Sequence, residues 1–139
     1  MPAHDRIGSY FSACSNASAG EIAGHFTTDA VIYDTNVSPV RGAAEIGAFW
    51  VKVRRRWHGA VWTLDTCVAE GNHAVCEWTM IGTAAGHAFS FHGSDHYDLT
   101  SDGLIQEIRQ YWTFDAEALN TGLIDYPYSP SPAPSNASR

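Results

Sequence analysis

From residue 59 to residue 114, apolar residues recur at every second position in four consecutive segments. The segments are GAVWTLDTCVAE, HAVCEWTMIGT, HAFSFHGSDHYDLT and LIQEIRQYWTF, and short turn sequences such as EGN and SDG separate them. A period of two is typical of strands with one buried face, and connections this short join antiparallel neighbours. The sequence therefore predicts an antiparallel meander over the second half of the chain.

The first half of the chain shows mainly helical spacing. In residues 5–17, 18–27 and 42–56, apolar side chains recur three or four positions apart, and one short strand is expected at 29–36 with a loop at 38–42. Helices followed by a meander predict an α+β fold. In such a fold, three N-terminal helices pack on one face of a curved, mostly antiparallel sheet.

We expect a single domain over residues 1–126 and a disordered Pro/Ser-rich tail over 127–139. The net charge of −7 argues against a nucleic-acid partner, which needs a basic face, and against adhesion to anionic membranes. No apolar run can span a bilayer and the start lacks a signal pattern, so we expect a soluble, cytoplasmic protein. The three cysteines and seven histidines show no metal-ligand spacing, which predicts reduced, buried thiols and no metal site.

Two aspartates lie on strand faces that are otherwise apolar. Asp95 shares its face with Phe89, Phe91 and Tyr97, and Asp34 shares its face with two aliphatic residues of the strand at 29–36. Because successive side chains alternate between the faces of a strand, both carboxyl groups are expected to point into the interior. Burial disfavours the charged form and neighbouring carboxyls repel, so one can act as a base while the other keeps its proton.

Each of these residues also has a purely structural interpretation. A buried Asp often accepts from backbone amides or pairs with an arginine, for which Arg41 and Arg109 are candidates. Tyr10, on the apolar side of the first helix, can donate a hydrogen bond beside the carboxyls, but a Tyr at helical spacing is also ordinary core. We interpret the basic run from Lys52 to Arg56 as a solvated helix end rather than an anion site.

Taken together, Tyr10, Asp34 and Asp95 resemble the constellation of a known family. The segment HFTTDAVIYDTNVSPVRGAAEIGAFW resembles the ketosteroid isomerase segment that carries the catalytic base, which falls on Asp34, and Tyr10 precedes it by the spacing of the oxyanion-hole Tyr. The segment SDHYDLTSDGLIQEI resembles the one with the protonated oxyanion-hole Asp, which falls on Asp95. Residues 6–115 are thus similar to the ketosteroid isomerases and SnoaL-like polyketide cyclases of the nuclear-transport-factor-two-like superfamily.

The resemblance implies a cone-shaped, cystatin-like fold and an enzyme without a cofactor. Asp34 would take a proton from the carbon next to a carbonyl, and Tyr10 and protonated Asp95 would hold the enolate oxygen. The result would be isomerisation or aldol cyclisation of a steroid-like or polyketide ketone. Phe26 and Trp50 fall where the family often has supporting tyrosines, so the supporting network is expected to differ.

The aromatic residues predict the kind of ligand. Trp50, Trp78 and Trp112 suggest a flat, aromatic-lined cavity for an apolar or polycyclic ketone, and Phe89 and Phe91 are further candidate substrate-binding residues. Each of them taken singly is also compatible with plain core packing.

Two alternative functions and the oligomeric state remain to be considered. Hydrolysis or dehydration through an Asp-activated water usually needs an arginine between the carboxylates, but strand parity places Arg109 on the opposite face. A non-catalytic small-molecule-binding domain is the other alternative, because this fold does not by itself imply catalysis.

The superfamily's habit predicts a homodimer through the outer sheet face, where Ile105 and Tyr111 are expected to be exposed. His92 and His96 are expected on that same face, away from Asp95.

Overall fold

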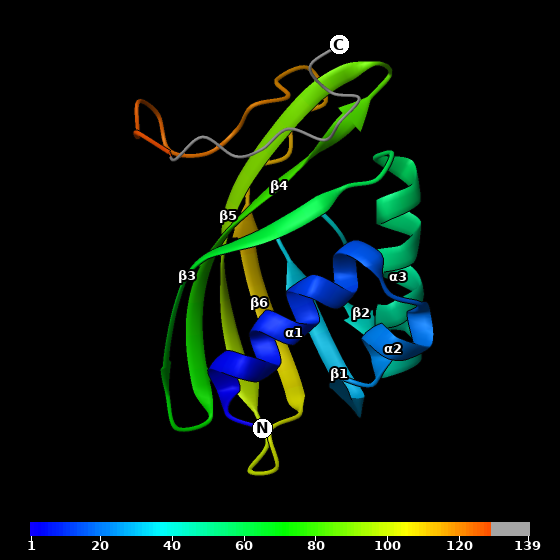
Figure 1. Ribbon diagram of the computed structural model, residues 1–139, viewed down its shortest axis with the longest axis vertical. Helices are drawn as coiled ribbons and strands as arrows, with labels where there is room; N and C mark the ends of the chain where they lie inside the picture. Colours follow the sequence, from blue (N-terminus) through cyan, green and yellow to red (C-terminus); the bar gives the residue numbers. More distant parts are fainter. Residues whose placement is uncertain (129–139) are drawn as a thin grey trace.

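A curved six-stranded sheet carries three helices on its concave side (Figure 1). The computed structural model describes residues 1–128. The helices are α1 (Ala3–Asn16), α2 (Ala19–Ala23) and α3 (Ala43–Arg56). The strands are β1 (Phe26–Asp34), β2 (Val40–Arg41), β3 (Val61–Glu70), β4 (His73–Ala84), β5 (His87–Leu99) and β6 (Ile105–Trp112). The predicted α+β class and its layering are confirmed.

The strand order across the sheet is β2-β1-β6-β5-β4-β3. Strands β3 to β6 form the antiparallel meander that the period of two predicts. The last strand, β6, also pairs in parallel with β1 and therefore lies between the first half of the chain and the meander. Residues from both halves of the sequence thus share one inner sheet face.

The second helix is shorter than predicted, and this moves the start of the first strand. A capping box between Ser18 and Glu21 begins α2, which has only five residues, and β1 begins at Phe26 rather than at residue 29. Two β-branched threonines follow Phe26 and favour a strand over a helix. The predicted loop at 38–42 contains the short strand β2, which pairs with β1.

Two close contacts fix α3 against the other helices. Gly47 approaches α2 so closely that a Cβ at this position would lie 2.1 Å from the Ala19 carbonyl oxygen. The Arg54 guanidinium donates to the carbonyl oxygens of Cys14 at 2.8 Å and Ala17 at 2.7 Å. These are carbonyls that the end of α1 leaves without helical partners, so Arg54 holds the end of α1 rather than an external anion.

The concave face of the sheet contributes to the core with the predicted alternation. Along β5, Phe91 and Tyr97 are buried, and Asp95 between them is only 3% exposed. Along β1, Ala30 and Ile32 are fully buried. Side chains from α1 and α3 complete this core.

The prediction for Ile105 was wrong, because this residue is fully buried. Asp98 pairs with Glu107 but Leu99 pairs with Ile105, so β6 carries one more residue than β5 at this point. Such a bulge reverses the alternation of faces. It turns Ile105 inward, although a strict period of two counted back from Ile108 places it outside.

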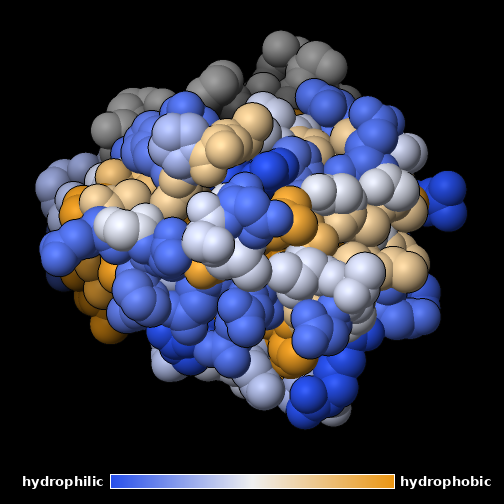
Figure 2. Space-filling view, turned by 90° about the horizontal axis from the view of Figure 1, so that it is seen from below, coloured by the Kyte–Doolittle hydropathy of each residue, from blue (hydrophilic) through white to orange (hydrophobic). Residues whose placement is uncertain are grey.

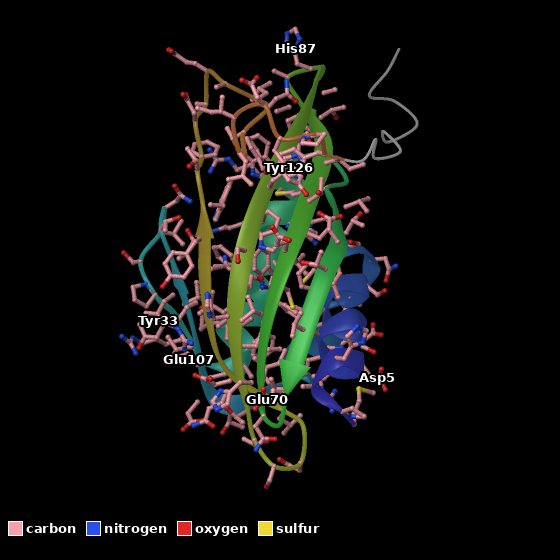
Figure 3. The ribbon with its side chains drawn as sticks, turned by 90° about the vertical axis from the view of Figure 1, so that its left-hand side faces the viewer. Asp5, Tyr33, Glu70, His87, Glu107 and Tyr126 are labelled. Atoms are coloured by element: carbon pink, nitrogen blue, oxygen red, sulfur yellow. The ribbon has the colours of Figure 1, made fainter. Side chains whose placement is uncertain are left out.

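The outer face of the sheet carries both polar and apolar side chains and is partly covered by the segment that follows β6 (Figure 3). Arg109 lies on this face in ion pairs with Asp98, at 2.9 Å, and with Glu107. It is therefore not the partner of either inward aspartate. His92 also lies on this face, where the Tyr128 ring stacks on it with centroids 3.6 Å apart.

Tyr128 and Pro127 are the part of the predicted tail that the structure describes, and residues 129–139 lie outside the described residues. The homodimer stays a prediction. Tyr111 is 53% exposed on the proposed face and Val68 is 72% exposed, so apolar surface is present there.

The face of the molecule shown in Figure 2 is mainly hydrophilic, with hydrophobic side chains in small separate patches. Within residues 1–128, no helix combines the length and hydrophobicity that crossing a bilayer requires. All three cysteines are free. Cys67 and Cys76 are cross-strand neighbours whose sulfur atoms lie 2.9 Å apart.

Candidate active site

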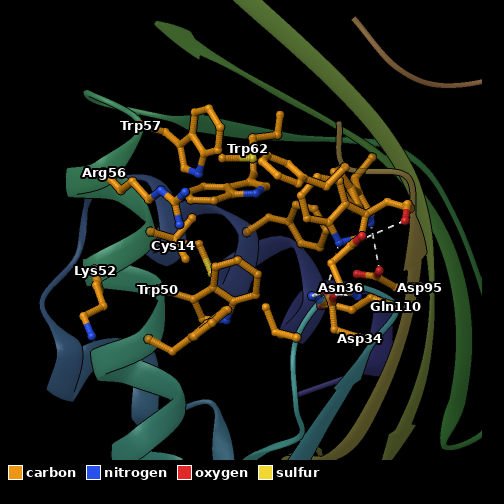
Figure 4. Close-up of a pocket in the computed structure, with 18 of the residues that line it drawn as sticks. Cys14, Asp34, Asn36, Trp50, Lys52, Arg56, Trp57, Trp62, Asp95 and Gln110 are labelled. Atoms are coloured by element: carbon orange, nitrogen blue, oxygen red, sulfur yellow. Dashed lines mark hydrogen bonds between the residues drawn. The ribbon is translucent and has the colours of Figure 1, made fainter. Parts of the chain in front are cut away.

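A cavity of about 310 Å³ lies between α1, α3 and the inner face of the sheet (Figure 4). Its size and its mainly apolar walls suit a small organic ligand. Four charged residues reach it: Asp34 and Asp95 from the sheet, and Lys52 and Arg56 from α3. Most of the remaining wall is aromatic or aliphatic.

The two aspartates belong to one row of side chains that crosses the sheet. Asp34 on β1 and Asp95 on β5 both pair with Gln110 on β6, the strand between them. The two aspartate Cα atoms are therefore two strand spacings apart, about 10 Å. Their side chains lie on the same face, so the carboxyl groups occupy one end of the cavity, as the alternation predicts.

Asp34 accepts three hydrogen bonds. The backbone N–H of Asn36 donates to Oδ1 at 2.6 Å, while Gln110 Nε2 at 2.5 Å and Trp112 Nε1 at 2.9 Å donate to Oδ2. All three groups are hydrogen-bond donors, so both oxygen atoms of Asp34 act as acceptors, as the oxygens of a carboxylate can. The bonds fix the orientation of Asp34 at the cavity wall.

Asp95 is buried more deeply and accepts two hydrogen bonds. Trp78 Nε1 donates to Oδ1 at 2.8 Å and the Tyr97 hydroxyl donates to Oδ2 at 2.7 Å. Burial raises the pKa of Asp95 from 3.8 to about 7, the bonds from Tyr97 and Trp78 oppose this rise, and the charge of Asp34 adds to it. At neutral pH the carboxyl group therefore exchanges between its neutral and ionised forms.

Tyr10 reaches the same cavity from α1. Burial, with the Cys14 thiol and the Asp95 carboxyl nearby, raises the pKa of Tyr10 well above its usual value. Its hydroxyl consequently keeps its proton and remains a possible donor. The structure thus brings all three predicted catalytic residues, Tyr10, Asp34 and Asp95, to one cavity.

The predicted aromatic residues divide into two groups. Trp50, Trp78 and Trp112 line the cavity, whereas Phe89 and Phe91 stack on each other in the core with ring centroids 5.1 Å apart and do not line it. The indole Nε1 of Trp50 is buried and has no hydrogen-bond partner among the described residues. Other aromatic wall residues that the sequence did not indicate are Phe11, Phe49, Trp57, Trp62 and Phe114.

Two polar residues of the site also escaped the sequence analysis. Tyr97 was assigned to the core, yet its hydroxyl binds Asp95. Gln110 has the same strand parity as Ile108 and Trp112, which was the signal that could have placed it inward beside Asp34. Within residues 1–128, no three His, Cys, Asp or Glu side chains are arranged to hold a metal ion.

The raised pKa of Asp95 predicts a pH-dependent stability. Since the folded state binds a proton that the unfolded state has lost between pH 4 and pH 7, the free energy of unfolding falls as the pH rises through this range. The Asp95 contribution should be fully present below pH 4 and lost above pH 7, a difference on the order of 4 kcal/mol. Urea unfolding of wild type and Asp95→Asn at several pH values measures it. Equal pH slopes in both proteins would contradict the burial argument.

Comparison with known proteins places this chain in a family. The family model for the SnoaL-like domain matches residues 7–108. The chain belongs to the SnoaL-like family, within the nuclear-transport-factor-two-like superfamily. A search of curated protein sequences finds no match.

Solved structures with the same fold include proteins of several kinds. A protein of unknown function with a cystatin-like fold from Methylobium petroleophilum is 26% identical, with a TM-score of 0.71 over 93% of this chain and 95% of that one. The epoxide hydrolase/cyclase-like enzyme SalBIII of salinomycin pyran ring formation is 16% identical, with a TM-score of 0.70 over 80% and 90%. A proposed isomerase of the SnoaL-like family from Agrobacterium tumefaciens is 18% identical, with a TM-score of 0.66 over 81% and 97%.

Proposed function

We propose that this protein is a cofactor-independent enzyme that removes a proton next to a carbonyl group and stabilises the resulting enolate. The observation that carries the proposal is the unequal pair of aspartates at one end of an aromatic cavity. Asp34 is held by three donors, whereas Asp95 is buried with a pKa of about 7. Two carboxyl groups in such different surroundings can take the roles of base and acid.

In this mechanism Asp34 accepts the proton from the α-carbon of a ketone, and the electron pair of the broken C–H bond moves toward the carbonyl oxygen. Protonated Asp95 and the Tyr10 hydroxyl donate hydrogen bonds to that oxygen as it becomes negative. A protonated carboxyl keeps acceptor capacity, so the bonds from Trp78 and Tyr97 persist. Return of the proton to another carbon gives isomerisation, and attack of the enolate carbon on a second carbonyl gives aldol cyclisation.

The cavity walls favour this chemistry in two ways. Aromatic side chains such as Trp50, Trp62 and Trp112 give flat apolar surfaces that suit a polycyclic ketone. They also surround the buried Asp95 with apolar side chains, and hydrogen bonds to a developing negative charge are stronger in such surroundings. Cyclase and isomerase names among proteins of the same fold are compatible with either product.

Hydrolysis or dehydration is a second candidate, and the raised pKa of Asp95 favours it too, since a general acid then lies near the base Asp34. The arrangement differs from an arginine-bridged carboxylate pair, because Gln110 lies between the two aspartates and Arg109 faces away. A domain that only binds its ligand would use the same cavity without needing Asp34 as a base.

Binding of phenols with graded acidity tests the proposal, because a phenolate oxygen resembles an enolate oxygen. We expect the affinity, measured by calorimetry, to rise systematically as the phenol becomes more acidic. Asp95→Asn should weaken the binding of the most acidic phenols by about 10- to 100-fold, since a hydrogen bond to a charged group is lost or weakened. The increase in affinity with phenol acidity should also become smaller above pH 7, because Asp95 loses its proton.

Asp29→Asn is the matched control for the phenol series. Asp29 is an exposed carboxylate on the same strand as Asp34, outside the cavity, and its replacement should leave phenol binding unchanged. If the affinity is independent of phenol acidity, or if Asp95→Asn behaves like the control, the oxyanion site does not exist and the proposal is wrong.

A further inference from the structure

Two cations lie on the part of α3 that borders the cavity. Lys52 and Arg56 are four residues apart, which places them on one side of the helix, and both line the cavity while their side chains are exposed to solvent. They therefore mark the region where the cavity meets the solvent. Figure 4 shows them on α3, across the cavity from Asp34 and Asp95.

The four basic residues at the end of α3 differ in their contacts. Arg54 holds the end of α1 through carbonyl oxygens, and Arg55 is exposed and does not line the cavity. Lys52 and Arg56 have no salt bridge within residues 1–128, where the ion pairs are formed by Arg109 and two histidines. The Arg56 guanidinium lies over the Trp57 ring at 5.5 Å from its centroid, beside the apolar wall.

The cavity is thus electrically polarised. One end carries Asp34 and the buried Asp95, the opposite side carries Lys52 and Arg56, and the other lining residues are uncharged. This positive pair lies on a protein with a net charge of −7. A free anion gains little from such a protein as a whole, so the pair acts only on a ligand whose apolar body already lies in the cavity.

We propose that the substrate carries an anionic oxygen group, such as a carboxylate, at the end opposite its ketone, and that Lys52 and Arg56 bind this group. This proposal rests on the proposed function, which places the ketone of the substrate at the end of the cavity with the two aspartates. The anionic group is attracted to α3 and repelled by Asp34, so the charges fix which end of the ligand enters first. Neutral polycyclic ketones lack this orienting interaction.

The competing explanation is that Lys52 and Arg56 only stabilise the end of α3, where cations oppose the negative end of the helix dipole. Arg55 separates the two explanations, because it lies in the same helical turn as Arg56 but away from the cavity. If the dipole is the whole reason, removing the charge of Arg55 has the same consequences as removing that of Arg56.

A pair of naphthols tests the anion site directly. 2-Naphthol carries the enolate-like oxygen alone, and 6-hydroxy-2-naphthoate adds a carboxylate at the far end of the same rings. We expect wild type, at low ionic strength and a pH of about 6, to bind the carboxylate compound about tenfold more tightly, the effect of two exposed ion pairs. Lys52→Gln combined with Arg56→Gln should remove this preference, Arg55→Gln should retain it, and high salt should abolish it in wild type.

Each outcome of the naphthol titrations decides one of the two proposals. A preference that persists in the double variant, one that Arg55→Gln also removes, or no preference in wild type overturns the anion site. Naphthol binding that does not depend on Asp95 overturns the proposed function instead. If the preference depends on Lys52 and Arg56 while Asp95→Asn has no effect, the anion site stands and the proposed function fails.

Discussion

Replacing Asp34 with Asn is expected to slow proton abstraction from an enolisable ketone by roughly 10²- to 10⁴-fold, the usual contribution of a positioned general base. Asn has nearly the same shape and its amide oxygen can still accept from Gln110 or Trp112, so the fold should persist while the base is lost. The measurement is exchange of the α-hydrogens of a cyclic aryl ketone such as 2-tetralone with deuterated water, followed by nuclear magnetic resonance.

Hydrogen exchange has the advantage that it does not depend on the product. Isomerisation and cyclisation both begin with the same proton abstraction, so the exchange rate reports the step that they share. Asp29→Asn, on the same strand but exposed, should exchange at the wild-type rate. If Asp34→Asn also keeps the wild-type rate, Asp34 is not the base, and a binding domain or a water-activating enzyme becomes the better explanation.

Replacing Gly93 with Ala is expected to destabilise the protein by about 1–3 kcal/mol, the usual cost of overpacking. A Cβ at this position would lie 2.3 Å from a ring atom of Trp78 and 2.9 Å from the Trp112 Cβ. Gly93 pairs with both tryptophans across the sheet, and their indoles lie close to it. Urea unfolding gives the change in the free energy of unfolding.

The same substitution should also disturb the site. Trp78 donates to Asp95 and Trp112 donates to Asp34, so moving either ring changes the hydrogen bonds of a site carboxyl. Gly8→Ala is the control, because Gly8 lies in α1 with nothing within 4 Å of an added Cβ, and Ala favours a helix. A Gly93→Ala protein as stable as wild type would mean that Trp78 and Trp112 can shift freely.

The inward position of the two aspartates could be predicted because β1 and β5 are regular in the segments concerned. A period of two then assigns each side chain to a face without knowledge of its neighbours. The same rule failed for Ile105, because the bulge depends on how β6 pairs with β5 and not on the residues of β6 alone. The start of β1 was also predicted wrongly. The helical spacing was extended to residue 27, but α2 ends after five residues and β1 begins at Phe26.

The composition of the cavity wall was harder to predict than the two carboxyl groups. Alternation places Phe89, Phe91 and Trp112 on the inner face but does not say that the cavity adjoins only part of that face. Likewise, four basic residues within the five positions 52–56 gave no sign that Arg54 binds carbonyl oxygens while Arg56 borders the cavity. Both distinctions depend on how the helices pack on the sheet.

The position of β6 between β1 and β5 also has a consequence for folding order. Asp34 and Gln110 are 76 residues apart in the chain, yet they are hydrogen-bonded neighbours. Such long-range pairing forms slowly because a large loop must close first. During synthesis, a growing chain that has not yet released β6 can form its helices and the hairpins of the meander, but the two aspartates have no strand between them. The pair of cavity aspartates is therefore completed only when the last strand enters the sheet.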